Sequence, residues 1–280
     1  MEINLTPLAT LSQIKETPSR RDGIPADLED DLRAYGAKMI QQAGILLKQK
    51  QVAMATAQVL FQRFWYTSSM EKYGIAEIGM GALYLASKLE ECPLRMRDVI
   101  NVYDLLIQQA KHLKSHDIST FHYEPMSYFS QTFYDMKDAL IVAEMQLLKR
   151  LGFYVDVSLP YGTLVNYLRV LNLLDDGKAC QMAWGYLNDA LQTPVYAIYP
   201  IPVIVCASIF LVIRHLQLPL PSERESELRW WELFDASYDD VWLVCGLIMR
   251  LYRPRSQADQ LRPSQLLTKK DVRRWLHDHK

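Results

Sequence analysis

The chain has 280 residues, of which 50% are hydrophobic and 22% charged, and its formal net charge at pH 7 is −1. This composition excludes a disordered, collagenous or low-complexity chain, and so small a net charge argues against a molecule that binds nucleic acid over its whole surface. The length allows one or two domains that bury their own cores without a disulfide or a metal ion.

Helical periodicity runs through nearly the whole chain, and no segment shows the two-residue alternation of a strand. After an N-terminal arm rich in proline, an apolar stripe from Leu28 to Leu46 predicts the first long helix, with acidic residues in its first turn as the helix dipole prefers. Further helices are expected over 51–66, 73–91, 96–112, 132–151, 161–173, 178–192, 201–215, 228–235, 238–252 and 264–277. The predicted fold class is therefore all-α.

An internal repeat links the two halves of the chain. The segment 75–94 aligns without gaps on 201–220, and the stripe of the preceding helix aligns at the same offset. Later matches recur at a smaller offset, which indicates a longer connection in the first copy near 108–130. The pattern predicts two copies of a five-helix unit joined around 152–160. The third helix of each unit is apolar on nearly all sides, so we expect it at the centre, where small residues such as Gly81 let neighbouring helices approach closely.

Few residues suggest catalysis, a cofactor or a metal ion. Gly79 and Gly81 resemble part of a dinucleotide-binding motif, but they lie inside a predicted helix with no preceding strand. His112 and His116 have a spacing that suits a metal ion, yet no third ligand is evident. The four cysteines are widely spaced in apolar surroundings and the longest apolar run, 201–213, is too short for a membrane span. We therefore expect an intracellular protein that is not an enzyme, binds no cofactor or metal and does not enter a membrane.

Two charged residues stand out in the first copy. Glu144 occupies a position on an apolar stripe where a hydrophobic residue is expected, and the matching position in the second copy is Ile248. Lys88 lies near the end of the predicted central helix of the same copy. A buried carboxylate needs a partner. One interpretation is a structural Lys88–Glu144 ion pair, and the other is that these charges serve a binding partner.

Several long motifs resemble the cyclin box. They are Leu85-Ala-Ser-Lys-Leu-Glu-Glu91, Cys92-Pro-Leu-Arg95 and Val142-Ala-Glu-Met-Gln-Leu-Leu-Lys-Arg-Leu-Gly-Phe153. The segments Gln51-Val-Ala-Met-Ala-Thr-Ala-Gln-Val-Leu-Phe-Gln-Arg-Phe64 and Arg97-Asp-Val-Ile-Asn-Val102 are similar to the cyclin L group, the transcription and splicing cyclins. The duplicated five-helix unit also resembles the cyclin fold. The resemblance implies an arm over 1–26, a first cyclin box over 27–153, a second over 154–253 and a basic C-terminal extension over 254–280.

The resemblance also implies a function. Lys88 and Glu144 match the lysine and glutamate with which a cyclin box binds a cyclin-dependent kinase, and the resemblance implies further kinase contacts at Glu90, Glu91, Arg95 and Arg97. Because the second copy has Arg214 and Ile248 instead, the first box is expected to make the main kinase contact. A kinase of the PITSLRE-motif group is the expected partner, with splicing or transcription factors as further partners in the nucleus. No contact with nucleic acid is expected, except through the basic C-terminus.

The sequence leaves alternatives open. A cyclin of the K, T or C type would have a similar fold, and so would a general transcription factor of the IIB type, although no N-terminal zinc ribbon is present. Leu32-Arg-Ala-Tyr-Gly36 replaces the substrate-docking motif of cell-cycle cyclins. The arm is expected either to pack along the cyclin fold or its kinase, or to be a flexible leader. A phosphate on Thr17, close to Arg20 and Arg21, would strengthen an ordered turn, whereas one on Thr6 would loosen the arm.

Overall fold

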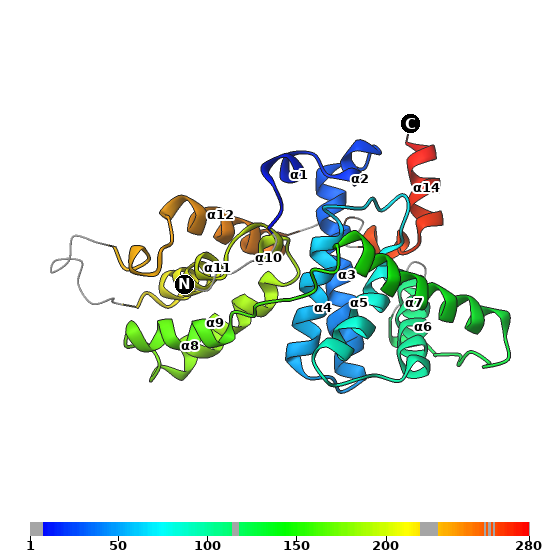
Figure 1. The fold of residues 1–280 in the computed structure, drawn as a ribbon, viewed down its shortest axis with the longest axis horizontal. Helices are drawn as coiled ribbons and strands as arrows, with labels where there is room; N and C mark the ends of the chain where they lie inside the picture. The colour runs from blue at the N-terminus through cyan, green and yellow to red at the C-terminus, as the bar shows by residue number, and fades with distance from the viewer. Residues whose placement is uncertain are drawn as a thin grey trace. The chain divides into compact units, whose positions relative to one another are not determined.

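The computed structural model describes residues 8–113, 118–218, 229–254, 256, 259 and 261–279 (Figure 1). Every secondary-structure element in these ranges is a helix, which confirms the predicted all-α class. The chain forms two compact units. The first unit comprises Ala9–Val157 and Arg255–Lys280, and the second comprises Met1–Leu8 and Ser158–Pro254. Thr6 and His116 lie outside the described residues.

The first unit is a bundle around a central helix. Helix α5 packs against each of four long neighbours, as its apolar composition predicts. The sequence of α5 explains this position, because its buried residues are small or apolar on nearly every face. The bundle comprises α3 (Ala26–Leu46), α4 (Gln51–Phe64), α5 (Ile75–Leu89), α6 (Met96–His112) and α7 (Gln131–Arg150), with a 3-10 helix, η1 (Ile118–Thr120), between the last two.

The close approach of α5 and α7 depends on a glycine. A Cβ atom at Gly81 would lie 2.7 Å from the Cβ of Ala143 and 3.0 Å from the backbone nitrogen of Glu144. No side chain larger than hydrogen fits there without a shift of one helix. Gly81 therefore sets the distance between α5 and the middle of α7.

The arm before the bundle contains two short helices, α1 (Leu11–Lys15) and α2 (Pro18–Arg21). Thr10 and Thr17 cap their N-termini with side-chain hydroxyls. The apolar side chains Leu8 and Leu11 are exposed, whereas the polar Thr17 and Ser19 are buried. The described part of the arm thus packs on the first unit through the polar Thr17 and Ser19 and through Ile24, which is buried in the core, while Leu8 and Leu11 stay exposed.

The C-terminal segment, expected as a separate basic extension over 254–280, belongs to the first unit. Its single predicted helix over 264–277 is instead a 3-10 helix, η4 (Pro263–Gln265), followed by α14 (Lys269–Asp278). Buried apolar side chains hold it, and the backbone nitrogen of Ala76 donates to the carbonyl oxygen of Leu267 at 3.2 Å. These side chains are Leu266, Leu267, Val272 and Leu276. In α14 the basic side chains of Arg273 and Arg274 remain exposed.

The second unit repeats the order of the first. Helices α9 and α11 begin at the same offset from α4 and α5, as the sequence repeat predicts, and α11 packs against α8, α9 and α12. The helix predicted over 228–235 is a 3-10 helix, η2 (Glu232–Phe234), within the described residues. The remaining elements are α8 (Tyr161–Val170), α9 (Gly177–Ala190), α10 (Val195–Ile198), α11 (Ile201–Leu216), α12 (Tyr238–Met249) and η3 (Arg250–Tyr252).

The central helix α11 also explains the buried thiols of the second unit. Burial raises the pKa of Cys206, on α11, and of Cys245, on α12, to about 12 in each case. Such thiols stay protonated and behave as small apolar side chains. Within the described ranges, no helix is both long enough and apolar enough to span a membrane.

Candidate functional site

Lys88 and Glu144 lie together on the surface of the first unit. Lys88 is in the last turn of α5, Glu144 is in the middle of α7, and Lys88 Nζ forms an ion pair with Glu144 Oε1. The side chain of Lys88 is 43% exposed and that of Glu144 is 18% exposed. Lys88 Nζ also lies 4.2 Å from the centre of the Tyr84 ring, a cation–π contact that holds the ammonium group in place.

The exposure of the pair bears on the two interpretations of its role. An ion pair in contact with water contributes about 0–1 kcal/mol to stability, because water already solvates both charges well. A pair in this setting adds little to the stability of the fold. A partner that covered it would have to satisfy both charges, and binding would therefore depend strongly on them.

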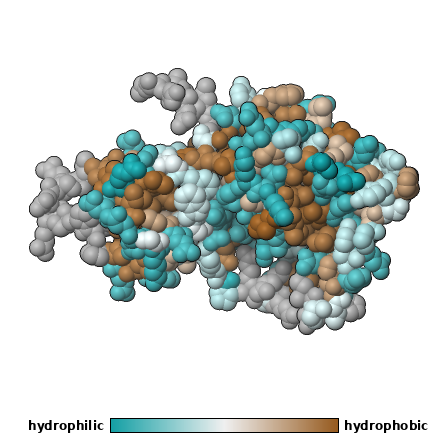
Figure 2. Space-filling view, turned by 90° about the horizontal axis from the view of Figure 1, so that it is seen from below, coloured by the Kyte–Doolittle hydropathy of each residue, from teal (hydrophilic) through white to brown (hydrophobic). Residues whose placement is uncertain are grey.

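Apolar side chains surround the pair. On α7, Ile141, Val142 and Met145 are 45%, 55% and 46% exposed, and on α5 Leu89 is 39% exposed. Together with Lys88 and Glu144 we call these residues the α5–α7 surface. Hydrophobic residues also gather in patches on the face drawn in Figure 2. An exposed apolar cluster around a charged pair is typical of an interaction site.

The buried side of α7 explains why Glu144 stays at the edge of this surface. Leu140, Ala143 and Leu147 are buried against α5, at the spacing of one helical face. Glu144 follows the close contact between Ala143 and Gly81, so its backbone lies near α5 while its carboxylate reaches Lys88. At the matching, described positions of the second unit, Ile248 is fully buried and the guanidinium of Arg214 lies 5.3 Å from the centre of the Phe210 ring, so these two residues form no equivalent pair.

The other four predicted contact residues differ in their surroundings. Glu90 is half-buried and its carboxylate accepts a hydrogen bond of 2.7 Å from Thr56 Oγ1 on α4. Arg97 pairs with Asp98 at 3.7 Å, and its guanidinium lies 5.4 Å from the centre of the Tyr128 ring. Glu91 and Arg95 are exposed, and neither side chain has a hydrogen bond or ion pair with any residue that the structure describes.

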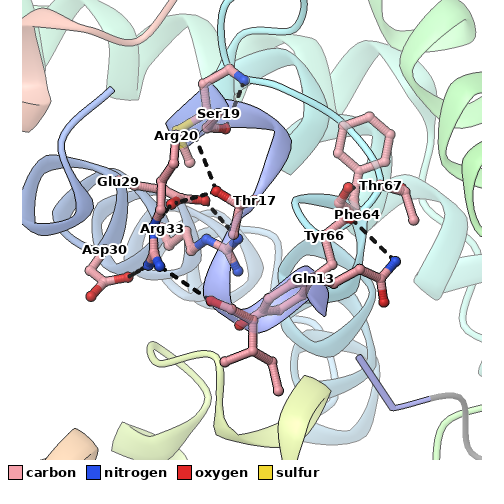
Figure 3. Close-up of polar contacts among 12 residues, drawn as sticks. Gln13, Thr17, Ser19, Arg20, Glu29, Asp30, Arg33, Phe64, Tyr66 and Thr67 are labelled. Atoms are coloured by element: carbon pink, nitrogen blue, oxygen red, sulfur yellow. Dashed lines mark hydrogen bonds and ion pairs between the residues drawn. The ribbon is translucent and has the colours of Figure 1, made fainter. Parts of the chain in front are cut away.

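A buried polar cluster that involves the arm was missed by the sequence analysis, which treated Glu29 only as an acidic residue in the first turn of a helix, where the helix dipole prefers one. Glu29 is fully buried, and three donors meet its carboxylate (Figure 3). Arg33 Nη2 donates to Oε1, and Arg20 Nε and Thr17 Oγ1 both donate to Oε2, each at 2.8 Å. The i, i+4 spacing of Glu29 and Arg33 was the available signal. We call Thr17, Arg20, Glu29 and Arg33 the Glu29 cluster.

The electrostatics of the Glu29 cluster follow from its burial. Burial by itself lowers the pKa of Arg33, but the Glu29 carboxylate together with Tyr66 and Asp30 outweighs this effect, so the pKa lies above its ordinary value. The Arg33 guanidinium also lies 4.4 Å from the centre of the Tyr66 ring. A phosphate on Thr17 would replace the hydroxyl that donates to Glu29 and would repel that carboxylate. Contrary to the expectation from sequence, it would loosen the arm.

The arrangement offers surfaces for binding. In the part of the chain that the structure describes, no group of His, Cys, Asp or Glu side chains is placed to hold a metal ion. His112 Nε2 instead lies 2.9 Å from Thr120 Oγ1, within hydrogen-bond distance. Among the exposed side chains of the first unit, those of the α5–α7 surface combine apolar area with a charged pair, which is the chemistry of a protein-binding site.

The bundle around α5, with the partly exposed Lys88–Glu144 pair at its surface, is the fold of one class of protein. Residues 9–156 match the family model described as Cyclin, N-terminal domain, and the chain belongs to the cyclin family. Members of this family are non-catalytic regulatory subunits of kinases, which agrees with the expectation that the chain is not an enzyme.

Within the family, the chain is similar to the cyclin L group. It is 40% identical to Cyclin-L2 of Homo sapiens over 240 residues, 86% of this chain and 44% of that protein. It is 41% identical to Cyclin-L1 of Danio rerio, over 89% of this chain and 47% of that one. It is 38% identical to Cyclin-L1 of Homo sapiens, over 97% of this chain and 48% of that protein. The chain thus spans about half the length of these curated relatives.

Solved structures share the fold. A chain in the crystal structure of the yeast RNA Pol II CTD kinase CTDK-1 complex has a TM-score of 0.64 at 17% identity, and the match covers 88% of this chain and 73% of that one. A chain of the CAK complex from Chaetomium thermophilum bound to ATP-gamma-S has a TM-score of 0.55 at 18% identity. That match covers 91% of this chain and 80% of the other.

Proposed function

We propose that this chain is a regulatory subunit that binds and activates a cyclin-dependent protein serine/threonine kinase through the α5–α7 surface. The observation that carries the proposal is the partly exposed Lys88–Glu144 pair amid the apolar side chains of that surface. The apolar residues supply area that becomes buried on binding, and the charged pair fixes orientation and selects the partner.

In the proposed mechanism the chain supplies no catalytic group. A protein kinase is active when a glutamate on its regulatory helix pairs with the lysine that positions ATP, and this requires the helix to lie inward. A surface that binds only the inward position shifts the kinase population toward the active state. The rigid contact between α5 and α7 at Gly81 suits this role, because it presents Lys88 and Glu144 in one geometry.

The finer proposal is a cyclin of the L type. We infer that the kinase belongs to the PITSLRE-motif group and acts in RNA polymerase II transcription and pre-mRNA splicing in the nucleus, with splicing or transcription factors as further partners. About 40% identity to Cyclin-L1 and Cyclin-L2 over most of the chain supports this proposal.

Copurification tests the proposal directly. The tagged chain is incubated with a panel of purified cyclin-dependent kinases, and bound kinases are identified by mass spectrometry. We expect the PITSLRE-type kinase to be retained and its phosphorylation of a Ser-Pro peptide to rise on addition of the chain. Failure to retain any kinase of the panel would refute the proposal, and retention of another transcriptional kinase would refute the assignment to the L type.

Variants at Lys88 and Glu144 test the surface. Lys88→Ala or Glu144→Ala is expected to weaken kinase binding by about 2–5 kcal/mol, or roughly 30-fold or more in Kd, because each leaves one charge covered and unpaired in the complex. Their melting temperatures should stay close to wild type, since the pair is partly exposed in the free protein. Binding is measured by surface plasmon resonance, and stability by calorimetry.

Matched controls lie on the same two helices. Glu77→Ala changes the opposite end of α5, and Lys149→Ala changes an exposed lysine near the end of α7. Both should bind the kinase as wild type does. A large loss of stability in Lys88→Ala with unchanged affinity would show that the pair is structural.

A further inference from the structure

A small cavity opens on the first unit beside the arm. Its volume is about 210 Å³, below the roughly 300–1,000 Å³ of pockets that hold drug-sized ligands. Its walls come from α2, from the connection between α4 and α5, and from the last residue of α7. The lining residues used below are Arg21, Asp22, Ser68, Ser69, Lys72 and Arg150.

Positive charge is in excess around this cavity. Arg21, Lys72 and Arg150 contribute three cations, and Asp22 contributes a carboxylate. Outside the cavity, Arg21 also forms a solvent-exposed pair with Glu16 at 3.8 Å. The side chain of Lys72 has no hydrogen bond or ion pair with any residue in the described ranges, and Arg150 Nη2 donates a long hydrogen bond of 3.4 Å to the Tyr73 hydroxyl. Guanidinium and ammonium groups converging on a small space form a site for an oxyanion.

The hydroxyl protons of two buried serines in the cavity wall, Ser68 and Ser69, have no acceptor among the residues that the structure describes. Ser68 is 4% exposed and its Oγ has no hydrogen-bond partner among the residues that the structure describes. Ser69 is 3% exposed, and its Oγ accepts from the backbone nitrogen of Glu71 at 3.2 Å, but no described residue accepts its proton. Buried hydroxyls are usually satisfied, so an unpaired one indicates a missing partner. An acceptor with several oxygens would satisfy both.

We propose that this cavity binds a phosphate group, carried by a phosphoserine or phosphothreonine side chain of a peptide or present as free orthophosphate. Three cations match its charge of about −2, and the two serine hydroxyls match its acceptor oxygens. The cavity is too small for a stretch of RNA. In addition, the one aromatic residue that lines it, Tyr73, is half-buried and packs against Phe64 with ring centres 5.3 Å apart, so it offers no stacking platform for bases.

The site is separate from the α5–α7 surface and does not depend on the proposed kinase partner. Its test uses the full chain alone. A fluorescent peptide Ala-Ala-phosphoSer-Pro-Ala-Ala and its unphosphorylated twin are titrated by anisotropy, and inorganic phosphate and an oligouridylate of similar length serve as competitors. Two-dimensional ¹⁵N NMR spectra locate the binding site on the chain.

Charge-matched double variants give the decisive comparison. Lys72→Gln with Arg150→Gln removes two cations of the cavity, while Lys149→Gln with Arg274→Gln removes one lysine and one arginine that are exposed outside it. We expect the first to weaken binding of the phosphopeptide at least about tenfold and the second less than about twofold. Ser68→Ala should also weaken binding, and melting temperatures verify that each variant is folded.

The competitors distinguish the sources of phosphate. Binding of the phosphopeptide well above that of inorganic phosphate assigns the site to a phosphorylated protein, and equal affinities assign it to free phosphate. Equal losses in the two double variants would overturn the proposal. It would also be overturned by NMR shifts outside the cavity, or by oligouridylate displacing the peptide more strongly than phosphate does.

Discussion

Removal of the buried carboxylate in the Glu29 cluster should strongly destabilise the first unit. Glu29→Gln keeps the size of the side chain but removes the charge that faces Arg33, whose side chain is 2% exposed. Removal of one partner of a buried ion pair typically costs about 3–5 kcal/mol, because the remaining charge stays desolvated. In Arg33, Nε and Nη1 are already buried without a described hydrogen-bond partner, so little else can compensate.

The remaining contact of Arg33, with the Tyr66 ring, does not offset the loss of the Glu29 charge. Its cation–π contact with Tyr66 is worth about 0.5–2 kcal/mol and is present in both proteins, so it does not reduce the difference. For a unit of this size, about 1 kcal/mol corresponds to about 2–4 °C, so the melting temperature should fall by about 6–20 °C. Differential scanning calorimetry and urea unfolding measure the change.

An exposed pair provides the control for the same chemical change. Glu16 lies 3.8 Å from Arg21, with side chains 67% and 59% exposed, so Glu16→Gln should cost about 0–1 kcal/mol. Hydrogen exchange of the arm supplies a second measurement, because Glu29→Gln leaves a single uncharged oxygen for the donors Thr17, Arg20 and Arg33, so the backbone amides of the arm should exchange faster. If the two variants melt within about 2 °C of each other, the reasoning on the Glu29 cluster is refuted.

Two further predictions concern packing and thiol reactivity. Gly81→Ala should lower stability by about 1–3 kcal/mol and weaken kinase binding, because the new methyl group would force α5 and α7 apart, and unchanged stability and binding would contradict the close contact. Gly246→Ala, where a Cβ meets nothing within 4 Å, should instead stabilise α12 by up to about 1 kcal/mol in calorimetry. Maleimide at pH 8 should spare Cys206 and Cys245 in the folded chain and label the partly exposed Cys180, which mass spectrometry would reveal. The raised pKa values also mean that stability should fall above about pH 9, since the unfolded thiols ionise first, and labelling of all three at equal rates would contradict the burial.

The Glu29 cluster and the phosphate cavity both lie where the arm meets the first unit. Thr17 and Arg20 belong to the cluster, and the next residue, Arg21, lines the cavity. The Glu29 carboxylate therefore holds the arm through Thr17 and Arg20. Arg21, the next residue of the arm, lines the cavity proposed to bind phosphate. Occupation of the cavity and the order of the arm should depend on each other, because both involve the same short helix α2.

Sequence alone determined the class and the repeat of this protein. Apolar residues recur with helical period and most prolines fall between or at the ends of the stripes, so helix positions follow from local patterns. The offset between the copies showed the duplication. The Lys88–Glu144 pair was also found from sequence, because a carboxylate on an apolar stripe is exceptional. These features depend on neighbours along the chain, or on a pattern that recurs within it.

Tertiary structure decided the features that depend on contacts between distant segments. Glu29 looks like an ordinary first-turn acid until Thr17 and Arg20 of the arm reach its carboxylate. The C-terminal segment looks like a solvated basic tail, and its few apolar residues show their role only where they meet the first unit. Burial is a property of what surrounds a residue in space, so a short polar or basic segment does not reveal by its own sequence which surface it will cover.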